Sequence, residues 1–479
     1  MSGFVRNVIK LGGGNVAAQA ISLVAVPVIT RIYAPDAFGA FSFVQSLVLV
    51  LFPVSTLRLN SAILLPEDER TAQDLLLASL LSVVVSACLA MPLMVVGLDR
   101  MAGLDGATEA VLWYLVAGVL VHGAVQCYEF WLLRHRRYNS MAWGAVAESV
   151  VDRMTVIGGG LLHQAAAVWL VFGRVAGAIA HLMVFLRRRD EGDTVPVFER
   201  SQLGTLPAVV RRYKNFPLYS TWAFLLANGA RELPTVVLAA LFNPLVAGLY
   251  SLGVRVLGFP ILMVGDAVAK VFFRHATSIS TERERLQEAT CQLVRYLIYL
   301  MLPPMLALIL FGPQLFRSVF GAEWVDAGVF ARILALSFLV AFLYRVLSIF
   351  FDMFENQAHR LMFDAAQFLG RIGGMTLAGL AWGVEAALWA LMLSTVLVQG
   401  AGIVHLLSLI GIGVPQTGRL LTVAVANLAP VTSMLGAAAA LSVGGIAQAG
   451  LVMAGIVAQC VWLVWREPRL AAMARDRLI

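Results

Sequence analysis

Residues 34–43 read Ala-Pro-Asp-Ala-Phe-Gly-Ala-Phe-Ser-Phe, and a related stretch, Asn-Pro-Leu-Val-Ala-Gly-Leu-Tyr-Ser-Leu, returns at residues 243–252. Each copy lies where one apolar run ends and the next begins. Pro stops one helix, and Gly lets the following helix pack closely against a neighbour. Three positions match at a constant offset of 209 residues: Pro35 and Pro244, Gly39 and Gly248, Ser42 and Ser251. The repeat predicts a chain of two related halves.

The sequence around the two copies is apolar along its whole length. Of 479 residues, 60% are hydrophobic and 13% are charged, which is about half the charged share of an ordinary soluble domain. This composition excludes a water-soluble globule and a disordered chain, and it predicts an all-α polytopic membrane protein. A membrane span needs about 20 mostly apolar residues. Fourteen runs qualify: 8–29, 37–64, 75–97, 109–131, 140–161, 164–186, 215–241, 245–273, 291–311, 328–350, 361–382, 385–409, 418–441 and 446–465.

The basic residues predict the orientation of these spans. The chain carries 35 Lys and Arg against 28 Asp and Glu, for a net charge of +7. With the N-terminus inside, the inner segments hold 22 of the cations and the outer segments hold three. The positive-inside rule therefore places both termini in the cytoplasm. The first run meets no signal-peptidase pattern before Pro27, so it is expected to be retained as a span.

Six spans separate the two copies of the repeat, and an even number gives both halves the same orientation. The predicted fold is therefore two six-helix lobes related by a parallel pseudo-two-fold axis, plus two C-terminal helices. The predicted divisions are an N-terminal lobe at 1–190, a cytoplasmic amphipathic linker at 191–214, a C-terminal lobe at 215–410, and two extra spans with a cytoplasmic tail at 411–479.

Ionisable residues inside spans are the candidate functional residues, because each costs several kcal/mol unless it faces a cavity or a partner. Apart from Lys10 and Arg419, which lie at the inner ends of their runs and are counted with the inner segments, ten cations but only four clear acids lie within the runs. Arg58, Arg174 and Arg255 have no acid within four residues, so they either bind an anion or pair with another helix. Arginine suits phosphate because its planar fork binds two oxygens. Glu148 and Asp152, one turn apart, either pair with a neighbouring arginine or take part in ion coupling.

Signals of catalysis are absent from the sequence. There is no P-loop, HExxH or G-x-S-x-G motif. The four cysteines, Cys88, Cys127, Cys291 and Cys460, form no CxxC pair, so neither a disulfide framework nor a zinc site is expected. The chain is expected to be neither an enzyme nor a nucleic-acid binder, and to need no cofactor or metal. Any transport would be driven by a gradient or by downstream consumption.

Five short phrases occur in order between about residues 7 and 370. They are Thr30–Pro35 with Phe38-Gly39, Leu57-Arg58 with Ala62–Pro66, Arg212–Ser220, Gly248–Tyr250 with Arg255–Leu257, and Phe320–Trp324. Together they resemble the O-antigen-type (Wzx-like) polysaccharide flippases of the multidrug/oligosaccharidyl-lipid/polysaccharide exporter superfamily. The resemblance implies two lobes around a hydrated cavity that opens alternately to either side of the bacterial inner membrane.

The same resemblance implies a substrate and site residues. The substrate would be an undecaprenyl-pyrophosphate-linked oligosaccharide, moved to the outer leaflet for O-antigen or exopolysaccharide synthesis. Related flippases hold the pyrophosphate with cavity arginines, which here implies Arg58 and Arg255, helped by Arg31 and Arg174. The pair Arg231-Glu232 departs from the uncharged amides of similar proteins, and it could bind sugar, couple an ion with Glu148 and Asp152, or lock a lobe. The implied partners are membrane lipids and a polysaccharide polymerase, with the chain itself a monomer.

Two alternatives stay open from the sequence. An integral-membrane polysaccharide polymerase or ligase would need a substantial outer loop with catalytic residues, and the outer loops here are short. A multidrug/cation antiporter of the same superfamily would favour acids over arginines in the cavity, the opposite of the count of ten cations to four acids.

Overall fold

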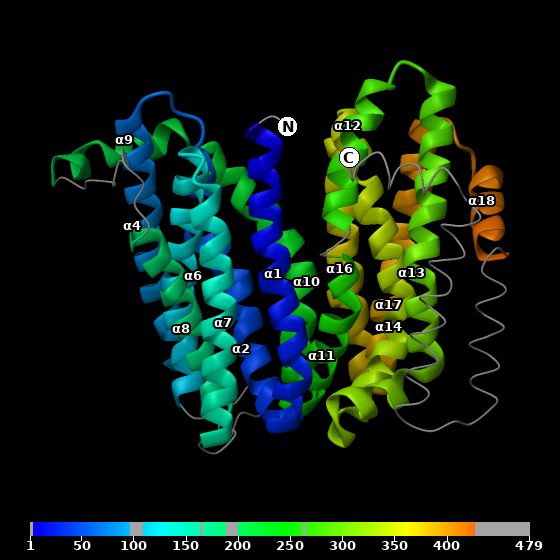
Figure 1. The fold of residues 1–479 in the computed structure, drawn as a ribbon, viewed down its shortest axis with the longest axis horizontal. Helices are drawn as coiled ribbons and strands as arrows, with labels where there is room; N and C mark the ends of the chain where they lie inside the picture. Colours follow the sequence, from blue (N-terminus) through cyan, green and yellow to red (C-terminus); the bar gives the residue numbers. More distant parts are fainter. Residues whose placement is uncertain (1–2, 96–108, 163–165, 188–199, 262–264, 427–479) are drawn as a thin grey trace. The chain divides into compact units, whose positions relative to one another are not determined.

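The computed structural model describes residues 3–95, 109–162, 166–187, 200–261 and 265–426. Within these ranges the chain forms helices joined by short connections and contains no strand (Figure 1), which confirms the predicted all-α class. Nine helices of the described ranges are long and apolar enough to cross a membrane. The protein is therefore a multi-pass membrane protein.

The chain divides into two compact units, unit 1 at Met1–Ser251 and unit 2 at Leu252–Ile479. Unit 1 contains α1 (Gly3–Ile32), α2 (Pro35–Ser55), α3 (Leu59–Ala62), α4 (Glu69–Val95), α6 (Glu109–Arg134), α7 (Tyr138–Leu162), α8 (Ala167–Arg187), α9 (Leu206–Arg212), α10 (Thr221–Leu241) and the start of α11 (Pro244–Pro260). Unit 2 contains the rest of α11 and then α12 (Asp266–Ser278), α13 (Arg283–Phe320), α14 (Val325–Leu347), α15 (Ile349–Met353), α16 (Gln357–Trp382), α17 (Val384–Leu409) and α18 (Val414–Ala426).

The first twelve predicted spans coincide with these helices, and three of the runs (37–64, 245–273 and 328–350) are each divided between two helices, the last of them between α14 and α15. The run 37–64 is broken because Leu57 and Arg58 adopt left-handed backbone, with φ of 49° and 57°, so α2 ends before them and α3 begins after. The run 245–273 is divided between α11 and α12. The thirteenth predicted span is described only to Ala426, as α18, and the fourteenth lies outside the described residues. The count of fourteen therefore stays a prediction.

The repeated stretches begin α2 and α11, and the two helices contact each other there. A Cβ on Gly39 would overlap the carbonyl oxygen of Pro244, and one on Gly248 would overlap that of Pro35. The Ser251 hydroxyl donates a hydrogen bond of 2.9 Å to the Ser42 hydroxyl. Equivalent positions of the repeat thus contact each other reciprocally, as surfaces related by a two-fold axis do.

Within each unit, a few pairs of helices make most of the contacts. In unit 1, α7 packs against α1 and α8, and α2 packs against α6, α8 and α10 (Figure 1). In unit 2, α14 packs against α13 and α17, and α17 packs against α16. The predicted lobe and linker boundaries stay predictions.

The predicted amphipathic linker is described from residue 200 onward, and residues 188–199 lie outside the described residues. Its helix α9 places Leu206, Val209 and Val210 against the core of α3, α4 and α6. The Thr205 hydroxyl donates a hydrogen bond of 2.9 Å to Asp74 of α4. The apolar side of this helix is therefore covered by unit 1.

Candidate functional site

Glycines on α8 allow this helix to lie close to the two acids of α7. A Cβ on Gly173 would lie 2.8 Å from the Asp152 carboxylate, and one on Gly177 would lie 2.7 Å from the Glu148 carbonyl oxygen. Small residues allow this close approach of two membrane helices. Glu148 and Asp152 are one turn apart, so both face α8.

The charged side chains of α7 and α8 form one network. Arg174 donates a 3.2 Å hydrogen bond to Asp152 and lies 3.9 Å from Glu148. Arg153 lies 3.1 Å from the same Asp152 carboxylate, which is 1% exposed. His181 Nδ1 lies 2.7 Å from Glu148. Buried charges require such partners, because an unpaired charge in a membrane interior is costly.

Neutral side chains extend this network onto α2 and α6. Arg174 donates to the Gln45 side-chain oxygen over 3.4 Å, and the Tyr114 hydroxyl donates to the same oxygen over 2.6 Å. The Tyr114 hydroxyl also lies 3.2 Å from His122 Nε2. The network therefore joins four helices through hydrogen bonds rather than through apolar contact alone.

A cavity of about 240 Å³ lies beside this network. Six of its nine lining residues are polar or charged, and the lining consists of Gln45, Leu49, Phe52, His122, Val125, Gln126, Glu129, Glu148 and Arg174. Gln45 Nε2 and Gln126 Oε1 are buried and have no hydrogen-bond partner among the described residues. Carboxylate, amide and imidazole groups around a polar cavity can hold water or exchange a cation or proton, and chains of acids and histidines mark ion pathways in membrane proteins.

The other predicted site residues lie elsewhere. Arg58 is at the start of α3, and its guanidinium carbon lies 4.6 Å from the centroid of the Phe224 ring on α10. Arg31 is exposed in the last turn of α1. Arg255 is half-buried on the part of α11 that belongs to unit 2.

Arg231 and Glu232 form a pair on α10. Arg231 Nε lies 3.5 Å from the Glu232 carboxylate, and the Arg231 side chain is 63% exposed. Arg231 also donates to the side-chain oxygen of Asn228, whose amide donates to the Leu49 carbonyl of α2 over 3.4 Å. Of the eight predicted site residues, the described contacts therefore bring together Arg174, Glu148 and Asp152 in one network and Arg231 with Glu232 in a second.

Sequence reasoning did not select several residues of the cavity. Glu129 lies near the end of the run 109–131, and neither Glu129 nor His122 is among the site residues predicted from the sequence. His122, Gln126 and Glu129 are spaced i, i+4 and i+7, which places them on one face of α6. That polar stripe in an apolar run was the available signal. Gln45 has no comparable signal.

Comparisons with known proteins agree with this fold. A sequence profile for the family described as "Polysaccharide biosynthesis protein" matches residues 28–329. The succinoglycan biosynthesis transport protein ExoT of Rhizobium meliloti (strain 1021) is 23% identical over 327 residues, which cover 66% of this chain and 62% of that relative. The match thus spans less than two thirds of the relative's length.

Two solved transporters share the architecture. The lipid II flippase MurJ, in an inward closed conformation, matches with a TM-score of 0.68 at 11% identity, covering 96% of this chain and 99% of that one. An inward-facing multidrug resistance transporter of the MATE family, in the MOP superfamily, matches with a TM-score of 0.59 at 15% identity, covering 82% and 94%. At these identities the likeness establishes the fold alone.

Proposed function

The chain belongs to the polysaccharide biosynthesis protein family, and we propose that it is a flippase for an undecaprenyl-pyrophosphate-linked oligosaccharide. In this proposal it moves the lipid from the inner to the outer leaflet of a bacterial inner membrane by alternating access, with both termini in the cytoplasm. A polysaccharide polymerase would receive the product. The flippase itself would act as a monomer.

The observation that carries the proposal is the family match on a chain with this transporter fold. The excess of intramembrane cations supports a phosphate-bearing substrate, because guanidinium groups bind phosphate oxygens in pairs. The names of the family and of its relative indicate a transporter of polysaccharide biosynthesis rather than an enzyme.

We assign pyrophosphate binding to Arg58 and Arg255, helped by Arg31 and Arg231. Stacking on Phe224 orients the Arg58 guanidinium while leaving its edge able to donate hydrogen bonds. Arg174 was part of the predicted phosphate set, but its salt bridge with Asp152 commits its charge to α7. We therefore place Arg174 in the coupling network.

Ion coupling is assigned to the cavity of unit 1. Glu148 lines this cavity, whereas Asp152 is held between two arginines. Glu148 is therefore the acid placed to exchange a proton or cation, and Asp152 fixes Arg174. The Arg231–Glu232 pair is the second candidate for coupling, through separation of the pair when an ion binds.

Reconstitution in liposomes tests the proposal. A short-chain polyprenyl-pyrophosphate sugar is added to one side, and its appearance on the other is scored with an external sugar-modifying enzyme. Wild-type protein should make the lipid accessible, while Arg58→Ala and Arg255→Ala should abolish this and fail to complement a flippase-null strain, although both proteins insert. Normal export by both variants would refute the site. Drug or cation counterflow without lipid movement would indicate that the protein is an antiporter rather than a flippase.

A further inference from the structure

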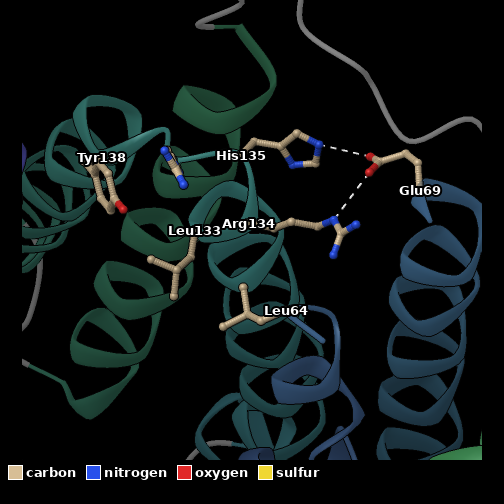
Figure 2. Close-up of a pocket in the computed structure, with 7 residues that line it drawn as sticks. Leu64, Glu69, Leu133, Arg134, His135 and Tyr138 are labelled. Carbon is tan, nitrogen blue, oxygen red and sulfur yellow. Dashed lines mark hydrogen bonds and ion pairs between the residues drawn. The ribbon is translucent and has the colours of Figure 1, made fainter. Parts of the chain in front are cut away.

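A second cavity, of about 600 Å³, opens in unit 1 where α4 and α7 begin and α6 ends (Figure 2). Two leucines, Leu64 and Leu133, supply its apolar lining. Its polar lining comes from Glu69, Arg134, His135, Arg136 and Tyr138. None of these residues has a role in the proposed transport site.

Arg134 and His135 form a fixed wall of this cavity. Arg134 Nη1 donates to the carbonyl oxygens of Ile63 and Pro66 over 2.8 and 2.7 Å, and Arg134 Nε lies 3.3 Å from the Glu69 carboxylate. His135 Nε2 lies 3.0 Å from the other oxygen of Glu69, and both of these contacts with Glu69 are drawn as dashed lines in Figure 2. These bonds use the donors of Arg134 and compensate the charge of Glu69.

Asp68, the acid before Glu69, is also occupied. Hydrogen bonds from Thr71, together with the charge of nearby Arg212, hold the pKa of Asp68 below its ordinary value. One of these bonds runs from the Thr71 amide to the carboxylate over 2.8 Å. The acids at the start of α4 therefore already have partners.

Arg136 and Tyr138 are the unoccupied donors of the cavity. Arg136 is exposed, and within the described part of the chain neither its guanidinium nor the Tyr138 hydroxyl has a hydrogen-bond or ion-pair partner. The cavity thus presents one uncompensated cation and one hydroxyl beside two leucines.

The backbone of Arg136 gives a second, independent reason to regard it as functional. Arg136 has a φ of 54°, in the left-handed region. Its amide donates to the Leu133 carbonyl and the Arg137 amide donates to the Leu132 carbonyl, over 3.1 and 2.9 Å. This pattern closes a helix at a residue that is usually glycine, because glycine has no Cβ to strain the turn. An arginine at that position keeps a long cation there at a cost in stability.

We propose that this cavity binds the phosphate group of a membrane lipid, with Arg136 as its main ligand and Tyr138 as a second donor. A guanidinium binds two phosphate oxygens at once, and basic pockets between membrane helices hold anionic headgroups. Leu64, which is 41% exposed, offers an apolar surface for the first part of the lipid chains. The phosphate could belong to an anionic phospholipid or to a polyprenyl pyrophosphate. The inference does not depend on the proposed function.

Native mass spectrometry of the full chain in detergent tests the site. Phosphatidylglycerol, undecaprenyl pyrophosphate and zwitterionic phosphatidylcholine are titrated separately against wild-type protein, Arg136→Gln and Arg285→Gln. Arg285 is an exposed arginine of unit 2, so its variant matches the change in net charge. Arg136→Gln should weaken binding of the anionic lipid roughly tenfold, the effect of losing a hydrogen bond to a charged group, whereas Arg285→Gln should bind as wild type does.

Arg136→Gly separates binding from folding. Glycine relieves the left-handed backbone, so this variant should melt at a higher temperature than wild type and still bind the anionic lipid roughly tenfold more weakly. A purely structural role for Arg136 would not weaken binding in a stabilised protein. Preference for phosphatidylglycerol would identify a phospholipid site, and preference for undecaprenyl pyrophosphate a carrier site. Equal affinity of wild type, Arg136→Gln and Arg136→Gly for both anionic lipids would overturn the proposal.

Discussion

Glu148 and Asp152 lie one turn apart on α7 but have different surroundings. Asp152 is 1% exposed and lies within 3.2 Å of both Arg153 and Arg174. Glu148 lines the 240 Å³ cavity of unit 1. It lies 2.7 Å from His181 and is more distant from Arg174, at 3.9 Å. The Asp152 carboxylate is compensated by two guanidinium groups, whereas the Glu148 carboxylate lines a cavity from which an ion can reach it. Replacing Glu148 by a neutral side chain is therefore expected to affect transport differently from replacing Asp152.

Glu148→Gln tests this difference. The amide keeps the size of the side chain and can still bond His181, but it carries no charge, so it cannot take up or release a proton and it holds a cation more weakly than a carboxylate does. Lipid transport driven by an imposed ion gradient should fall roughly tenfold, within the usual range for a coupling between sites. The measurement is transport in liposomes with and without the gradient. Transport without a gradient should change much less.

Glu385→Gln provides the matched control, because Glu385 is an exposed acid in the first turn of α17. It should keep the wild-type response to the gradient. If Glu148→Gln keeps that response as well, the 240 Å³ cavity beside Glu148 has no part in coupling. The Arg231–Glu232 pair then becomes the remaining candidate.

The sequence identifies the charged members of this network but not their pairing. Glu148, Asp152 and Arg174 stand out because ionisable residues are rare inside spans. The bond from Arg174 to Asp152 joins residues 22 positions apart on two helices, so it depends on how α7 and α8 pack. Gln45 and Tyr114 are neutral, and nothing in the local sequence distinguishes them from ordinary packing residues.

At the scale of elements, the contact between α7 and α8 sets the geometry of the network. Gly173 and Gly177 lie one turn apart on α8, and each faces backbone or side-chain atoms of α7. Because the two helices approach so closely there, a methyl group has no room without a shift of α7. Such a shift would move Asp152 relative to Arg174.

Gly177→Ala should therefore destabilise the protein. The new Cβ would lie 2.7 Å from the Glu148 carbonyl and 3.0 Å from Asp152 Cβ, and overpacking of this kind costs about 1–3 kcal/mol. Thermal unfolding in detergent should show a lower midpoint. Gly158→Ala on α7 is the control, since a Cβ at that position would have no neighbouring atom within 4 Å. There, alanine should stabilise the helix slightly, and a lowered midpoint in the control would contradict the packing argument.

The helices themselves were largely predictable, and the exceptions have physical causes. Long apolar runs locate the spans because the membrane demands them. The break at Leu57 and Arg58 was not predicted because neither residue type favours left-handed backbone. Helix α13 extends well beyond its predicted run of 291–311 and contains Pro303, Pro304 and Pro313. Neighbouring helices can satisfy the backbone groups that a proline frees within a membrane.

At the scale of the whole molecule, the repeat is the feature that links sequence, fold and movement. Equivalent positions of α2 and α11 contact each other at Gly39 and Gly248, and the equivalent serines share a hydrogen bond. Helices that touch through backbone and small side chains can separate without breaking a large apolar interface. If the protein works by alternating access, this contact is expected to open and close during transport.

Ser42→Cys with Ser251→Cys, in a background without Cys88, Cys127, Cys291 and Cys460, tests that expectation. The two hydroxyl oxygens lie 2.9 Å apart, and the side chains are short, so the pair should form a disulfide under mild oxidation. A disulfide between α2 and α11 would hold the contact closed. Lipid transport in liposomes should fall at least roughly tenfold after oxidation, and a reductant should restore it.

A second pair of serines shows whether any cross-link would have this effect. The hydroxyl oxygens of Ser22 on α1 and Ser149 on α7 lie 3.1 Å apart, and both helices belong to the first half of the repeat. Ser22→Cys with Ser149→Cys should cross-link as readily, yet transport should continue, because helices of one half are expected to move together. If the Ser42–Ser251 disulfide forms completely and transport continues unchanged, α2 and α11 stay together throughout the cycle. Access would then have to alternate while this contact stays closed, and the repeat would form a permanent contact between α2 and α11.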